Sequence, residues 1–246
     1  SDNGLLNAPV PLTRLPIGVG ERAEILVDLS ADLGDTVYFN TFSNEFPLGY
    51  QGGPGVPSGD PIGPLDDTIM SLLQINVVAP TANPVTAIPA VLTSNTIWPS
   101  AGVPIKVFTF QEHPAFLIDS TPYNMSVNNF VVQQEDVQIW EVHNITPVAH
   151  PFHIHGNHFY ILSREGNPPP ANEQGRKDVV LIPPQEKVQL GLDLQGGMQL
   201  LLQVDMEKVS QEAREDVTDR VVEIVRNRID EFGVRARQRP GRRERF

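Results

Sequence analysis

The sequence of 246 residues contains no cysteine. This absence excludes disulfides, cysteine-based zinc sites, iron–sulfur clusters and a cysteine nucleophile within the chain. It also excludes a blue-copper centre built by this chain alone, because such a centre needs a cysteine thiolate. The formal net charge of −12 argues against nucleic acid as a partner, since nucleic-acid binding needs a basic surface. No run of about 18 apolar residues is present, so we expect no membrane-spanning segment.

The composition changes near residue 190. Residues 1–204 hold 7 basic and 20 acidic residues, whereas residues 205–246 hold 11 basic and 10 acidic ones. All but one of the 23 prolines lie before residue 185. Two kinds of chain therefore meet near residue 190. The arginine-rich stretch at 235–245 is typical of a solvated tail, with an anionic partner surface as the alternative.

The first part of the chain predicts an all-β fold. Short runs of β-branched and aromatic residues alternate with segments rich in glycine and proline, which is typical of a sandwich or barrel. After it, apolar residues recur at steps of three and four, which predicts an amphipathic helix over 206–232. The expected strands are 24–29, 36–40, 71–78, 105–110, 127–133, 137–143, 158–163 and 179–182.

Four of the six histidines fall within nine residues, at His150, His153, His155 and His158. On a strand, His153 and His155 point to the same face and His158 to the other. Imidazole is a common ligand of copper and zinc, so this cluster predicts a metal site, with copper as the expected ion and zinc as the alternative. The competing interpretation is that these histidines only pack or form hydrogen bonds, and the isolated His113 and His143 fit it better.

The segment from His150 to Gly156 (HPFHIHG) resembles a copper-binding motif of the multicopper oxidases, the family of laccases and bacterial copper-resistance oxidases. Segments 20–28, 140–144 and 175–184 resemble other parts of the same family. This resemblance covers about residues 1–190 and implies cupredoxin-like Greek-key β-sandwiches, to which the periodicity adds a C-terminal amphipathic α-helix. By the resemblance, His150 would bind a type 1 copper, His153 a type 2 copper and His155 one copper of a type 3 pair.

The sequence departs from the family where most copper ligands would come from. The family takes further histidines from a first domain, and a cysteine, histidines and usually a methionine from the end of the last domain. This chain holds three of about eleven expected ligands. The resemblance therefore implies copper binding with weak or no reduction of oxygen, and whether the chain is an enzyme stays open. His158, His143 and His113 match no ligand position of the family.

Two segments near the end of the chain, 190–205 and 226–234, resemble the first periplasmic region of SecD, a protein-export subunit. A natural fusion, an assembly accident and an engineered chimera all fit such a junction. The predicted organisation has four parts: the closing part of a middle cupredoxin domain at 1–80, a linker at 81–104, a C-terminal cupredoxin domain without its last strands at 105–190, and a SecD-like strand, helix and basic tail at 191–246.

The leading hypothesis is a copper-binding remnant of a multicopper oxidase, acting on a small-molecule substrate if it retains activity. One alternative is a hydrolase with zinc or copper on the histidines, for which Glu112, Glu141 or Asp178 would be the base. Another is a non-catalytic, export-related interaction protein. A sandwich without its last strands exposes a sheet edge, so a homo-oligomer is expected unless the chain covers that edge itself. Both resembled families imply a periplasmic or extracellular location.

Overall fold

The computed structural model describes residues 2–56, 63–82, 87–97, 100–112, 115–133 and 136–193. They belong to one structural unit, Ser1–Met198. The predicted helix at 206–232, the basic tail and His113 lie outside the described residues. Within the described ranges, no helix has the length and apolar character needed to cross a membrane.

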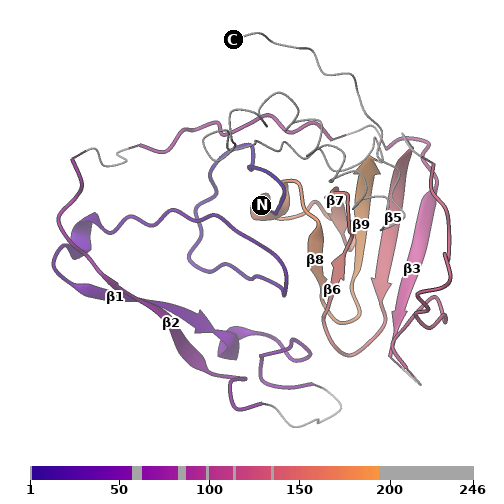
Figure 1. Ribbon diagram of the computed structural model, residues 1–246, viewed down its shortest axis with the longest axis horizontal. Helices are drawn as coiled ribbons and strands as arrows, with labels where there is room; N and C mark the ends of the chain where they lie inside the picture. Colours follow the sequence, from indigo (N-terminus) through magenta and orange to yellow (C-terminus); the bar gives the residue numbers. More distant parts are fainter. Residues whose placement is uncertain are drawn as a thin grey trace, which may run out of the picture. The chain divides into compact units, whose positions relative to one another are not determined.

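The described residues form three β-sheets (Figure 1). The first pairs β1 with β2, the second has the strand order β4-β3-β5-β9-β7, and the third pairs β6 with β8. The strands are β1 (Thr36–Phe42), β2 (Ile69–Asn76), β3 (Ile105–Gln111), β4 (Leu117–Ile118), β5 (Val137–Asn144), β6 (His150–His153), β7 (Phe159–Arg164), β8 (Val179–Ile182) and β9 (Lys187–Asp193). Three short 3-10 turns are Ser30–Asp32, Ser43–Glu45 and Ala171–Glu173. The prediction of a mainly β fold is confirmed.

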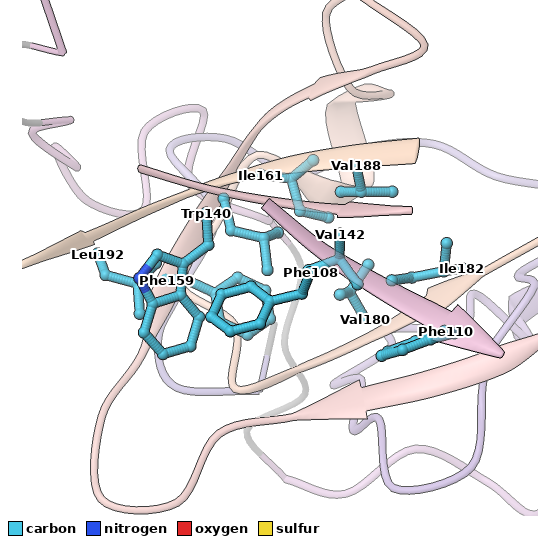
Figure 2. Packing of buried hydrophobic residues seen from close by; sticks show 11 residues of the cluster. Phe108, Phe110, Trp140, Val142, Phe159, Ile161, Val180, Ile182, Val188 and Leu192 are labelled. Atoms are coloured by element: carbon cyan, nitrogen blue, oxygen red, sulfur yellow. The ribbon is translucent and has the colours of Figure 1, made fainter. Parts of the chain in front are cut away.

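The five-stranded sheet and the β6–β8 pair enclose one hydrophobic core (Figure 2). Alternate residues of β3, β5, β7, β8 and β9 point into it, as expected of strands with one buried face. On β5, Trp140 and Val142 face the core, whereas Glu141 and His143 lie on the outer face of the sheet. The buried residues of the cluster are Phe108, Phe110, Trp140, Val142, Phe159, Ile161, Val180, Ile182, Val188, Leu190 and Leu192.

Strand β5 lies at the centre of the larger sheet, parallel to β3 and antiparallel to β9. Strand β9 also pairs antiparallel with β7, so it is bonded on both sides. Leu190 and Leu192 of β9 are fully buried. The described part of the sandwich therefore includes β9 and extends to Asp193.

Two predicted strands are wrong. Residues 24–29 contain an apolar run, but Leu26 and Val27 are more than 60% exposed and the segment pairs with no described strand. Residues 127–133 are also not a strand, although Phe130 packs its ring against Phe108 and Trp140. In both segments the residue types favour extended backbone, but a strand also needs a partner for its hydrogen bonds.

Candidate metal centre

Strand β6 carries the first part of the histidine motif and sends its side chains to two sides. Phe152 packs against the core, and His150 on the same side contacts the ring of Phe110 at 5.7 Å between centroids. His153 is three residues from His150, so it leaves β6 on the opposite face. Gly156, with φ of +72°, then turns the chain toward β7, in a conformation that favours glycine.

His153 and His155 form an adjacent, exposed pair. Their ring centroids lie 4.6 Å apart with an angle of 62° between the planes. The Nδ1 atom of His153 lies 2.8 Å from the backbone oxygen of Asp178. A carbonyl oxygen only accepts, so Nδ1 carries the proton and the lone pair of Nε2 is available to a metal.

His150 sits in a different environment, half-buried between aromatic rings. Phe110 and Phe116 both meet its ring edge-on. Its Nε2 lies 2.9 Å from the hydroxyl of Thr146, whose single proton has two oxygen acceptors nearby, on Asn144 at 2.8 Å and Val148 at 2.9 Å. We therefore assign the ring proton to Nε2, which leaves Nδ1 as the metal-binding atom. Burial lowers the pKa of His150 and favours the neutral imidazole that a metal needs.

The turn that aims His150 is built on Asn144, which is 1% exposed. Its side-chain NH2 group lies 2.7, 3.1 and 2.9 Å from the backbone oxygens of Val148, Ile182 and Pro183, which share its two protons. Its oxygen accepts from the backbone N–H of Thr146 at 3.0 Å. Neither Asn144 nor Thr146 is among the site residues that the sequence predicts. A buried asparagine directly after a core strand was the available signal, because such a residue must find partners.

The structure thus divides the predicted set of four histidines. His153 and His155 lie together, His150 lies on the other side of β6, and the ring of His158 packs edge-on against Tyr160 at 6.4 Å. In the described part of the chain, no three histidine or carboxylate side chains gather in an arrangement ready for a metal ion. The ligand roles of all four histidines therefore remain predictions.

The three carboxylates considered as a catalytic base have other surroundings. Glu141 bonds to His143 at 2.6 Å and to Gln189 at 2.6 Å on the outer face of the five-stranded sheet. Asp178 forms a two-bonded ion pair with Arg22 at 2.6 and 2.8 Å. Burial alone would raise the pKa of Asp178, but Arg22 outweighs this effect and lowers it, which makes Asp178 a weak base. Glu112 lies near His150, on which its charge acts in the direction of a higher pKa.

The Glu141–His143 pair gives a pH-dependent contribution to stability. Burial works to raise the pKa of Glu141, but the bonds from His143 and Gln189 outweigh it and hold this pKa below the ordinary value of 4.5. The unfolded chain therefore binds this proton first as the pH falls. The contribution is complete above pH 4.5 and is lost as the pH falls through the lower pKa of the folded state.

We expect Glu141→Gln to lower the free energy of unfolding by about 1 kcal/mol at pH 7, because the amide replaces charged hydrogen bonds with neutral ones. At pH 3, the difference from the parent protein should shrink. Chemical denaturation at both pH values measures it. Glu24→Gln, at an exposed glutamate, is the control and should change nothing at either pH. A difference that is the same at pH 3 and pH 7 would contradict the assignment of charge to Glu141.

Comparison with known proteins agrees with the fold and the motif. Residues 99–199 match the multicopper oxidase family. The chain is 31% identical over 204 residues to the cell division protein FtsP of Sodalis glossinidius, covering 74% of this chain and 36% of that protein. It is 25% identical over 194 residues to the multicopper oxidase mco of Staphylococcus epidermidis, covering 77% of this chain and 35% of that protein. The chain spans about a third of the length of these curated relatives.

Among solved structures, the laccase-like multicopper oxidase CueO from an Ochrobactrum species superposes with a TM-score of 0.62 at 25% identity, covering 78% of this chain and 42% of that one. A separate, short match links the chain to the protein translocase subunit SecD of Elusimicrobium minutum, with 48% identity over 54 residues, which is 21% of this chain and 11% of that protein. The chain therefore carries a multicopper oxidase-like domain with a cupredoxin fold. This domain is related both to the FtsP proteins and to the multicopper oxidases named mco.

Proposed function

We propose that this chain supplies histidine ligands for copper in a protein of the multicopper oxidase type. The observation that carries the proposal is the His153–His155 pair, with rings 4.6 Å apart and the Nδ1 of His153 engaged by a backbone oxygen. That hydrogen bond fixes the tautomer and presents Nε2, as metal-binding histidines commonly do. Imidazole nitrogen suits copper among the first-row metals, so the donors fit the ion that the family implies.

The proposal assigns His150 to a centre of its own. Its metal-binding atom is Nδ1, whereas that of His153 is Nε2, and the two side chains leave β6 on opposite faces. Copper bound at these centres would accept and pass on single electrons from a small-molecule substrate. The protein's part is to orient the imidazoles and to keep His150 neutral between Phe110 and Phe116. Without a cysteine in the chain, no centre here alone gives the intense blue absorption of a thiolate-bound copper.

The resemblance gives His153 and His155 to two different coppers, but this chain lacks most of the other ligands of both. We therefore expect the purified chain to bind about one Cu²⁺ with the His153–His155 pair as shared ligands, with nitrogen coordination and no intense blue band. His153→Ala should weaken binding by at least about tenfold, because one of two imidazole ligands is lost. Titration followed by electron paramagnetic resonance measures both results. His143→Ala is the matched control, since this histidine bonds to Glu141 on the outer face of the sheet, and it should bind copper like the parent.

The same titration decides whether the oxidase-type proposal stands. Copper bound by the parent and lost by His153→Ala supports the oxidase-type proposal. A protein that binds no Cu²⁺ after reconstitution would overturn it.

Three further points belong to the proposal, of which the first two rest on resemblance and the third on exposed apolar residues. The resembled families support a location outside the cytoplasm. The short match to SecD supports a junction near residue 190 and a SecD-derived end of the chain. We infer that exposed apolar residues on β1 and β2, among them Tyr38, Leu72 and Leu73, are covered by another protein surface in the assembled state, which fits the expected homo-oligomer.

A further inference from the structure

The N-terminal segment 2–22 is bound to the corner of the chain that leads into β8. The backbone N–H of Asn3 donates to the oxygen of Arg176 at 3.1 Å. The ammonium group of Lys177 lies 3.1 Å from a carboxylate oxygen of Asp2 and 2.9 Å from one of Glu21. Segment 2–22 and residues 176–178 therefore form one polar network, although about 150 residues separate them in the sequence.

Arg22 is the part of this network that reaches Asp178. Its two terminal nitrogens lie 2.6 and 2.8 Å from the two carboxylate oxygens of Asp178. The same nitrogens also donate to the backbone oxygens of Gly20 at 2.9 Å and Asp2 at 3.1 Å. An arginine held by four contacts fixes the direction of the carboxylate that it binds, more than a flexible surface ion pair would.

The backbone of Asp178 in turn holds the candidate copper ligand. Its carbonyl oxygen accepts from Nδ1 of His153 at 2.8 Å and from the backbone N–H of Ile154 at 3.0 Å. The side chain of Asp178 thus faces Arg22, while its carbonyl faces His153. A rotation of the Asp178 backbone would misalign the carbonyl oxygen that accepts the hydrogen bond from Nδ1 of His153.

We propose that Arg22 is a positioning residue for His153, acting through Asp178. By fixing the side chain of Asp178, Arg22 fixes the carbonyl that selects the Nδ1–H tautomer of His153 and leaves Nε2 for the metal. In water, neutral imidazole favours the Nε2–H tautomer, so this selection has to be maintained by the protein. The metal part of the inference rests on the proposed function, whereas the tautomer part can be tested without any metal.

The alternative is that the pairing of β6 with β8 holds the carbonyl by itself. Position 153 is paired with Val179 in that ladder, and the N–H of Ile154 bonds to the same oxygen. Under this alternative, Arg22 contributes to stability only. The two explanations differ in what happens to the His153 ring when Arg22 is removed and the sandwich stays folded.

The test is nitrogen-15 NMR of the histidine rings in the metal-free protein, above the pH at which they lose their charge, followed by Cu²⁺ titration. In the parent, His153 should be mainly Nδ1–H. In Arg22→Ala the population should move toward Nε2–H, and Cu²⁺ affinity should fall by about tenfold. Arg22→Lys keeps the charge without the two-bonded geometry, so it should recover only part of both effects.

The control is Arg14→Ala. Arg14 forms a similar exposed, two-bonded ion pair with Glu45, at 2.8 and 3.0 Å, but has no described contact with His153. It should leave the tautomer and the affinity unchanged. If Arg22→Ala is poorly folded, Asp178→Asn provides the second variant, since it keeps the backbone carbonyl but weakens the bond to Arg22, and it should shift the tautomer in the same direction.

The outcomes are distinguishable. A His153 ring that stays Nδ1–H in folded Arg22→Ala and Asp178→Asn overturns the inference and leaves the strand pairing as the cause. A tautomer shift with no copper bound by any variant supports the positioning role and overturns the proposed copper function. A tautomer shift with a parallel loss of affinity supports both.

Discussion

Lys177→Met is expected to lower the free energy of unfolding by about 3 to 5 kcal/mol, the usual cost of removing one partner from a buried ion pair. The side chains of Lys177, Asp2 and Glu21 are 7%, 0% and 9% exposed. Methionine is unbranched like lysine and only one heavy atom shorter, but it leaves the buried carboxylates of Asp2 and Glu21 without their cation. Burial alone would lower the pKa of Lys177, but Glu21 and Asp2 outweigh it and hold this pKa above the ordinary lysine value.

Denaturant unfolding measures this loss, and two further variants test its cause. Lys187→Met is the control. The Lys187 side chain is 46% exposed and its ammonium group lies 4.0 Å from Glu141, so this ion pair is long and solvated. The substitution should therefore lower the free energy of unfolding by less than about 1 kcal/mol. The triple variant Lys177→Met, Asp2→Asn, Glu21→Gln removes all three charges and should recover much of the loss. A loss for Lys177→Met as small as that of the control would show that segment 2–22 is not held by this network.

The same network marks the limit of what the sequence could predict about the site. The spacing of two residues predicts that His153 and His155 point to the same side, and the structure shows their rings adjacent. The bond between Arg22 and Asp178 spans 156 residues, and no local pattern predicts it. Asp178 is a candidate base by sequence, because a carboxylate near a histidine cluster can serve as one. The ion pair with Arg22 lowers its pKa and makes it a weak base instead.

The sequence predicted the strands that have clear β-forming residue types, and it did not predict β6 and β9, where another feature obscured the pattern. β5 and β3 were found from their residue types, and β8 from a short buried run. β6 was missed because Pro151 interrupts it, and a proline argues against a central strand. In β9, Val188, Leu190 and Leu192 alternate with polar residues or glycine and are fully buried. The resemblance to SecD begins at Leu190, inside this strand, so the sequence assigns the second half of β9 to another fold.

A second large effect is expected at Asn144, where Asn144→Ala should lower the free energy of unfolding by about 3 kcal/mol. The carbonyls of Val148, Ile182 and Pro183 would lose their common donor inside the protein, and a buried polar group left without a partner costs about 1 to 3 kcal/mol. These carbonyls lie in the turn before β6 and at the end of β8, so the loss would loosen the connection between the two strands.

Asn124→Ala is the matched control for this variant. Both asparagines accept a hydrogen bond from the N–H two residues ahead, at 2.9 Å for Asn124 and 3.0 Å for Asn144, but Asn124 is exposed. The control should therefore change the free energy of unfolding by less than about 0.5 kcal/mol. The difference between the variants isolates the buried carbonyl bonds from the local turn.

Asn144→Ala should also reach the candidate ligand His150. The hydroxyl of Thr146 loses its acceptor on Asn144 and becomes free to donate to Nε2 of His150, which would move the ring proton to Nδ1 and block the atom assigned to the metal. Nitrogen-15 NMR should show this exchange for His150 and not for His153, whose acceptor is Asp178. If the His150 tautomer is unchanged in a folded Asn144→Ala, then Val148 alone directs the Thr146 hydroxyl, and Asn144 acts only on stability.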